Sequence, residues 1–123
     1  MLRDGPIPRF VHGAIEYAAG VIFLVAPFVL GFDAGAATAV SIVVGVLVLV
    51  VAASTEGPTS LSNALQIQLH VLLDYALAAF LIASPFLFGY SDETEPTAFF
   101  IAMGVLHLLV TIGTRFKPRE QRR

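Results

Sequence analysis

Apolar residues fill four long runs of the chain, and short polar or Pro/Gly-containing stretches separate these runs. The runs cover about residues 10–30, 37–53, 64–88 and 97–114. A helix rises about 1.5 Å per residue, and the hydrocarbon core of a bilayer is about 30 Å thick. Each run is therefore close to the length that crosses a membrane as a helix. The pattern predicts four membrane-spanning helices.

The breaks between the runs predict how these helices pair. Residues 32–36 and 91–96 form two short connections, and residues 56–60 hold the Glu-Gly-Pro-Thr-Ser segment that joins the two halves of the chain. Short connections join antiparallel neighbours in helical bundles. We therefore expect two helical hairpins in tandem.

The two predicted hairpins begin with the same sequence pattern. Residues 11–32 read VHGAIEYAAGVIFLVAPFVLGF, and residues 69–90 read LHVLLDYALAAFLIASPFLFGY. A duplicated two-helix unit keeps its direction through the membrane, so its copies are related by an axis along the membrane normal. The sequence predicts an all-α integral membrane four-helix bundle with this pseudo-two-fold axis. It forms one transmembrane domain over residues 1–123, with repeats at about 10–55 and 64–115.

Composition and charge agree with a membrane protein. Hydrophobic residues make up 57% of the chain and charged residues 13%, which is too little charge for a small soluble domain. All Lys and Arg residues lie before Phe10 or after Thr114. Basic flanks stay cytoplasmic, so we expect both termini in the cytoplasm, with a bacterial or archaeal inner membrane as the location. The basic tail at 115–123 is expected to contact anionic lipid, and no folded basic surface indicates nucleic-acid binding.

Both repeats contain the motif small-Pro-Phe-x-x-Gly-aromatic, at residues 26–32 and 84–90. The proline should bend or end the helix, and the glycine permits the left-handed conformation that stops it. We expect Phe32 and Tyr90 to anchor the outer interface; a hinge or ligand pocket is the alternative for this motif. Its positions are Pro27, Phe28 and Gly31 in the first repeat and Pro85, Phe86 and Gly89 in the second.

This motif and the duplication resemble the SPW-repeat family of small membrane proteins. Its unit is a hairpin with a Ser-Pro-Trp motif and a Gly-aromatic exit. Here Phe28 and Phe86 stand in place of the motif Trp, and Ala26 replaces one Ser. The resemblance covers about residues 10–115. It implies a four-span membrane protein and no particular activity.

The polar pattern inside the spans is His-x-x-x-(Glu/Asp)-Tyr. His12 and Glu16 share one helix face, and His70 and Asp74 repeat the arrangement in the third helix. A polar cluster that fixes the helices against one another is one interpretation. The same four residues could instead bind a haem or a metal ion, because imidazole and carboxylate suit Zn, Fe or Mn. Without cysteines, the chain offers no thiolate ligand.

A proton or ion relay is a third interpretation, because acids and histidines within spans are its usual parts. Few polar residues continue such a path in the second and fourth helices. The candidates are Ser41, His107, Thr111 and Thr114. His107 aligns with Val48 of the first repeat and could act as a further ligand only if it faces the first and third helices.

No nucleophile–base set or phosphate-binding loop is present in the sequence, so we expect no enzyme. The leading hypothesis is a structural or accessory membrane component that packs with itself or with other membrane subunits. Gly45 and Gly104 occupy equivalent positions of the second and fourth helices, where a missing side chain lets helices approach closely.

Overall fold

A computed structural model describes residues 5–55, 61–62 and 64–115 of the chain. Within these residues, each of four helices is long and apolar enough to cross a membrane. The helices differ from the predicted runs by up to three residues at their ends, and α4 begins before Pro96 because proline is tolerated in a first turn. The helices are α1 (Arg9–Val29), α2 (Gly35–Ser54), α3 (Ile67–Leu87) and α4 (Thr94–Gly113).

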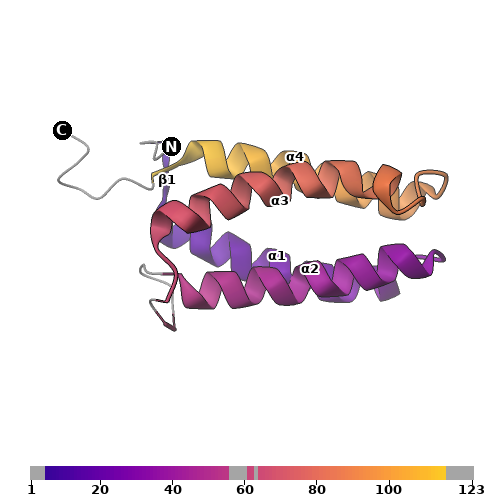
Figure 1. The fold of residues 1–123 in the computed structure, drawn as a ribbon, viewed down its shortest axis with the longest axis horizontal. Helices are drawn as coiled ribbons and strands as arrows, with labels where there is room; N and C mark the ends of the chain where they lie inside the picture. Colours follow the sequence, from indigo (N-terminus) through magenta and orange to yellow (C-terminus); the bar gives the residue numbers. More distant parts are fainter. Residues whose placement is uncertain (1–4, 56–60, 63, 116–123) are drawn as a thin grey trace.

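The helices form the two predicted hairpins, α1 with α2 and α3 with α4 (Figure 1). Contacts between the hairpins are far fewer than those within them. The basic tail predicted as a lipid anchor lies outside the described residues from position 116 onward. The fold is an all-α bundle of two tandem hairpins, as the sequence predicts.

Small residues bring the two helices of each hairpin together. A Cβ atom added at Gly45 would lie 2.8 Å from the Gly20 carbonyl oxygen across the α1–α2 interface. In the second hairpin, a Cβ atom at Gly104 would lie 3.1 Å from the Ala78 carbonyl oxygen. Close backbone approach supplies van der Waals contact where lipid gives little drive for helix association. The packing role predicted for both glycines is confirmed.

The Pro–Gly motif ends α1 and α3 in the same way. Gly31 and Gly89 adopt φ values of +68° and +74°. The Phe32 N–H donates to the Pro27 carbonyl at 3.0 Å, and the Tyr90 N–H donates to the Pro85 carbonyl at 2.9 Å. This bond closes a Schellman turn, in which glycine takes the left-handed position. The predicted role of the motif as a helix terminator is confirmed.

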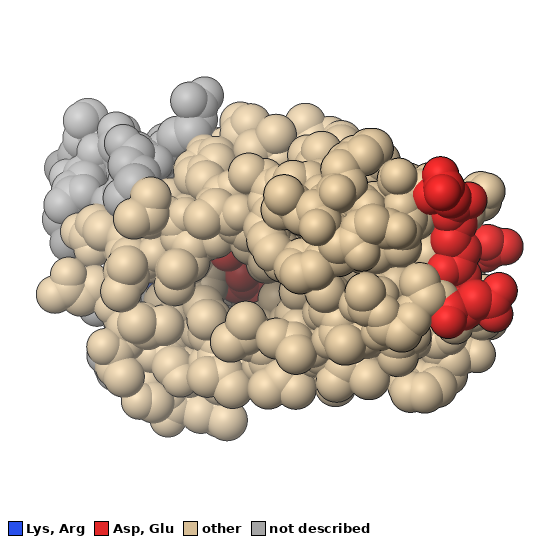
Figure 2. Space-filling view, turned by 45° about the vertical axis from the view of Figure 1, so that its right-hand side comes forward, with Lys and Arg blue, Asp and Glu red and all other residues tan. Residues whose placement is uncertain are grey.

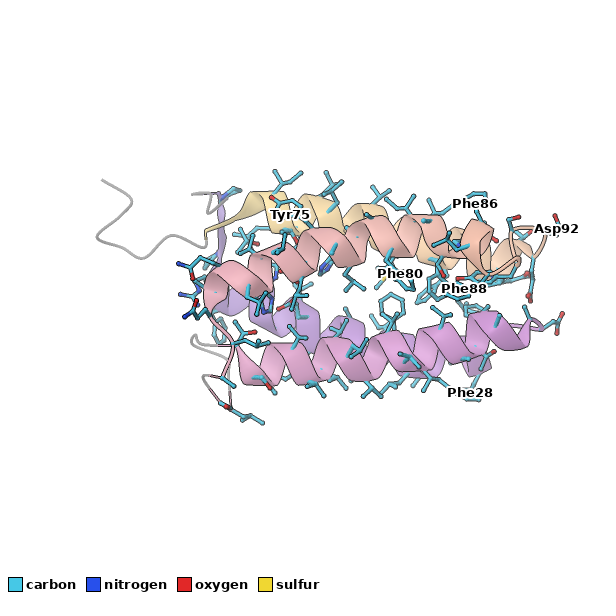
Figure 3. The ribbon with its side chains drawn as sticks, viewed as in Figure 1. Phe28, Tyr75, Phe80, Phe86, Phe88 and Asp92 are labelled. Atoms are coloured by element: carbon cyan, nitrogen blue, oxygen red, sulfur yellow. The ribbon has the colours of Figure 1, made fainter. Side chains whose placement is uncertain are left out.

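The predicted interface anchor is wrong for Tyr90, whose side chain is buried. Its hydroxyl hydrogen-bonds to Ser84, and its ring packs edge-on against Phe100 at 5.6 Å. Phe28 and Phe86 are instead the exposed aromatic residues of the motif, and Figure 3 shows both pointing away from the bundle. The Tyr90 ring turns inward because the hydroxyl finds a buried partner there.

Short parallel bridges tie the helix ends together at one end of the bundle (Figure 1). Strand β1 (Ile7–Pro8) pairs with β2 (Thr114–Arg115), with Ile7 opposite Thr114. The bridge between Thr55 and Leu65 is its counterpart, and it also joins the first repeat to the second. Each bridge joins the start of an odd-numbered helix to the end of an even-numbered one. The two bridges obey the pseudo-two-fold relation of the repeats.

Candidate functional site

The four candidate residues from the two His/acid pairs lie together between α1 and α3. Helix α1 contributes His12 and Glu16, and helix α3 contributes His70 and Asp74. All four are buried, with at most 5% of any residue exposed. Their i, i+4 spacing places each pair on one helix face, and the repeat turns the two faces toward each other. The structure thus joins both predicted pairs into one cluster, which we call the His/acid cluster.

Imidazole nitrogens and carboxylate oxygens alternate within this cluster. The His12 Nε2 atom lies 3.4 Å from Glu16 Oε2 and 3.2 Å from Asp74 Oδ2. The His70 Nε2 atom lies 2.9 Å from the same Glu16 oxygen and 3.1 Å from the same Asp74 oxygen. Each histidine therefore faces the acid of its own helix and the acid of the other repeat.

Two threonines orient the histidine rings by contacting Nδ1, the ring nitrogen that faces away from the carboxylates. Thr55 Oγ1 lies 2.6 Å from His70 Nδ1, and Thr114 Oγ1 lies 2.8 Å from His12 Nδ1. Each threonine hydroxyl also donates to the carbonyl four residues earlier, in the helix that precedes the threonine. A hydroxyl has one hydrogen to donate, so it accepts from the ring. Both Nδ1 atoms therefore carry the proton, and both Nε2 atoms point into the His/acid cluster.

This arrangement needs a proton or a cation between each Nε2 atom and the carboxylate oxygens that it faces. A neutral ring protonated at Nδ1 presents a lone pair at Nε2, and here that lone pair would face carboxylate oxygens. One proton on each Nε2 atom satisfies the contacts, and so does a single divalent cation. Either choice balances the two carboxylates, which is needed because unpaired charge is costly inside a membrane.

The donor set fits a small divalent metal ion. One ligand atom from each residue can be chosen so that all four lie within 4.8 Å of one another. Tetrahedral Zn²⁺ with ligand bonds of about 2.0–2.2 Å separates its ligands by about 3.3–3.6 Å. The four nitrogen–oxygen distances of 2.9–3.4 Å approach that spacing. A haem does not fit, because the carboxylates occupy the space between the imidazoles that a porphyrin would need.

His107 reaches the edge of the same cluster from α4. Its Nε2 atom is buried, lies 3.3 Å from Asp74 Oδ1 and makes no hydrogen bond of good geometry in the described structure. Its ring centroid is 6.4 Å from that of His12. His107 therefore faces the first and third helices, where it contacts the second oxygen of Asp74 and can position that carboxylate.

The relay candidates separate into two groups. Thr114 and His107 touch the His/acid cluster, and the Thr111 hydroxyl donates to the His107 carbonyl. Ser41 lies elsewhere and donates to the Phe23 carbonyl, which Pro27 leaves without its helical donor. The buried core beyond the cluster is aromatic and aliphatic around Phe100. Among the described residues, the His/acid cluster, His107 and the threonines that contact them thus lie near the end of the bundle where β1 and β2 pair, and Ser41 lies apart from them.

Sequence reasoning missed one partner of the cluster. Thr55 was not singled out, although its equivalence with Thr114 across the repeats was readable from the alignment. Its role depends on the Thr55–Leu65 bridge, which the hydropathy pattern did not indicate.

The fold and the His/acid cluster define a four-span membrane protein, built from two repeated hairpins with a buried polar centre between them. A family model described as the SPW repeat domain matches residues 10–116. The chain belongs to the SPW-repeat family, as its motifs indicate. Comparisons with curated proteins and with solved structures find no match.

Proposed function

We propose that this protein is a divalent-metal-binding module of the membrane, with His12, His70, Glu16 and Asp74 as ligands. The observation that carries the proposal is the convergence of both Nε2 atoms on the two carboxylates, with Nδ1 of each ring held by a threonine. Metal-bound histidines commonly donate their other ring N–H to a fixed acceptor, which sets the tautomer and the ring orientation. A mixed imidazole and carboxylate set suits Zn²⁺, Fe²⁺ or Mn²⁺.

The direct test is metal content and coordination in the untagged protein purified from membranes. We expect about one divalent ion per chain by elemental analysis, and a visible Co²⁺ spectrum of tetrahedral type after exchange. Asp74→Asn should lose both signals because it removes a charged ligand. The matched control is Asp92→Asn, in the exposed turn at the far end of the bundle in Figure 3.

Equal metal content in the wild type and Asp74→Asn, with no tetrahedral Co²⁺ spectrum, would overturn the metal proposal. The cluster would then be a pair of protonated histidines between two carboxylates that fastens the hairpins together. That result would favour a purely structural or accessory role for the protein.

An accessory role, by packing with copies of itself or with other membrane subunits, remains the second candidate. The observation that favours it is the weak contact between the hairpins, which leaves apolar faces of α2 and α3 open to the surroundings. Crosslinking in native membranes, followed by mass analysis, tests it. The recovery of the chain alone and as a single copy would count against this role.

The relay hypothesis receives less support, because the His/acid cluster and His107 lie at one end of the bundle and an aromatic and aliphatic core around Phe100 follows them. A cytoplasmic location of both termini is compatible with the pairing of β1 and β2 at one end. Protease protection in oriented vesicles tests that orientation.

A further inference from the structure

A cleft of about 650 Å³ opens between α2 and α3, on the side where the two hairpins meet. Its size is typical of a small-molecule site. Its walls are apolar except at one end, where Glu16 and Asp74 line it. Figure 2 shows acidic atoms at the bottom of a hollow in the uncharged middle of the face, apart from the acidic patch at its right-hand end. The His/acid cluster is therefore reachable from the lipid side of the protein.

The cleft has the dimensions of an extended hydrocarbon chain rather than of a compact molecule. Its α2 wall extends from Ala39 to Val51, which is about 18 Å along a helix. On the α3 side, Phe80 and Phe88 face the cleft, with ring centroids 6.0 Å apart (Figure 3). An occupant that matches these walls is apolar over most of its length and polar at one end only.

The depth of the polar end restricts which amphiphile can fit. Helix α3 has 21 residues, or about 32 Å, and thus matches the hydrocarbon thickness. Asp74 is its eighth residue, so it lies about 10 Å from the helix start. A phospholipid keeps its headgroup at the interface. A free lipid-soluble molecule with a small head can place that head at this depth.

The chemistry of the His/acid cluster determines which polar head of a lipid-soluble molecule can bind there. An ionised carboxylate accepts hydrogen bonds and donates none, so the head must be a donor. The two acids are already balanced by two protons or by one divalent cation, as argued above, so no net charge attracts a cationic head. A charged ammonium would also lose its hydration at this depth. A neutral hydroxyl donates a hydrogen bond and carries no charge, so it meets both conditions.

We propose that the cleft between α2 and α3 binds a lipid-soluble molecule with one apolar chain and a hydroxyl-bearing head, such as a long-chain phenol or hydroquinone, whose hydroxyl donates to Glu16 or Asp74. The proposal rests on the cleft and the carboxylates and does not require that the cluster holds a metal ion. It concerns binding alone and involves no covalent or redox step.

The test compares decylhydroquinone with its dimethyl ether, which has the same chain and no hydroxyl. Each probe is equilibrated with nanodiscs that contain the protein and with empty nanodiscs of the same lipid. We expect bound decylhydroquinone in excess over the empty discs, approaching one per chain, and about tenfold weaker binding of the ether, because hydrogen bonds to charged acceptors are among the stronger ones. Equal binding of the two probes, or no excess of either, overturns the proposal.

Two variants of α2 locate the site. Val43 lines the cleft, and Val46 is exposed on the same helix outside it. Val43→Phe should reduce hydroquinone binding at least tenfold, while Val46→Phe should leave it unchanged. Equal effects of the two variants contradict the cleft as the site.

The same nanodisc samples separate this proposal from its competitors. Their metal content should not change in Val43→Phe, so loss of the probe and loss of the metal are distinguishable results. The number of chains per disc, measured by mass, reports whether a second copy fills the cleft. A wild-type dimer that Val43→Phe dissociates, together with no hydroquinone excess, assigns the cleft to a second copy and overturns the ligand proposal.

Discussion

The His12 ring of the first repeat donates to Thr114 of the second repeat, with 2.8 Å between Nδ1 and Oγ1. His70 of the second repeat makes the equivalent bond with Thr55 of the first, at 2.6 Å. Each half of the chain therefore orients the histidine of the other half. Because both threonine hydroxyls donate to the helices that precede them, the bonds fix which nitrogen of each ring faces Glu16 and Asp74.

Thr55→Val and Thr114→Val should each weaken metal binding by about 10–100-fold, the usual effect of removing a partner that orients a ligand. Valine keeps the shape of threonine but cannot accept the Nδ1 proton, so the ring is free to rotate or change tautomer. Competition with a chelator of known Zn²⁺ affinity measures the change.

Thr111→Val is the matched control for these two variants. The Thr111 hydroxyl is equally buried in α4 but donates to the His107 carbonyl and does not touch a ring of the cluster. An affinity loss in Thr111→Val as large as that in Thr114→Val would contradict an orienting role.

Ser41→Ala should destabilise the protein by about 1–2 kcal/mol, because it leaves the buried Phe23 carbonyl without the hydroxyl that replaces its helical donor. Thermal unfolding in detergent measures the loss. Ser91→Ala, in the exposed turn before α4, provides the control. If the two alanine variants unfold at the same temperature, the Ser41 bond contributes nothing measurable.

Much of this fold could be predicted because its determinants are local. Helix length, the Pro–Gly exits and the small residues at Gly45 and Gly104 follow from runs and motifs within one repeat. The duplication then places His12 beside His70 by symmetry. The helix ends were less accurate because the first turn of α4 tolerates Pro96.

The remaining features depend on how distant segments meet. The His12–Thr114 bond joins residues 102 positions apart, and the bridges that place both threonines are too short to leave a hydropathy signal. The prediction placed Tyr90 at the interface, like Phe32 of the first repeat. The inward position of Tyr90 depends on its hydrogen bond with Ser84, and the first repeat has Ala26 at the equivalent position. His107 faces the cluster through the rotation of α4, which the alignment with Val48 does not specify.

Gly45→Ala should destabilise the bundle by about 1–3 kcal/mol through overpacking, since its Cβ atom would lie 2.8 Å from a backbone oxygen of α1. This oxygen belongs to the backbone, which cannot move aside as easily as the end of a flexible side chain. Gly35→Ala is the control, because a Cβ atom there meets nothing within 4 Å. Thermal unfolding of both variants in one detergent checks this prediction, and a loss of stability in Gly35→Ala alone would contradict it.

Tyr90 should make stability fall at high pH. Burial raises the pKa of its phenol above the ordinary value of 10.0, and the hydrogen bond with Ser84 acts in the opposite direction. As pH rises through 10, the unfolded chain releases this proton while the folded chain retains it, so unfolding becomes more favourable.

Comparison of the wild type with Tyr90→Phe isolates this effect from the other tyrosines. The melting temperature of the wild type should fall more steeply above pH 10 than that of the variant. Parallel pH profiles for the two proteins would show that Tyr90 titrates alike in the folded and unfolded chains.

The crossed bonds between histidines and threonines also bear on how such a chain arises. A peptide with a single hairpin has a histidine but lacks the threonine that would orient it, and it holds one acid where two are needed. Two identical copies facing each other would supply every missing group. The present chain is thus equivalent to a fused homodimer, and a separated half should regain the His/acid cluster only by pairing, either with the other half or with a second copy of itself.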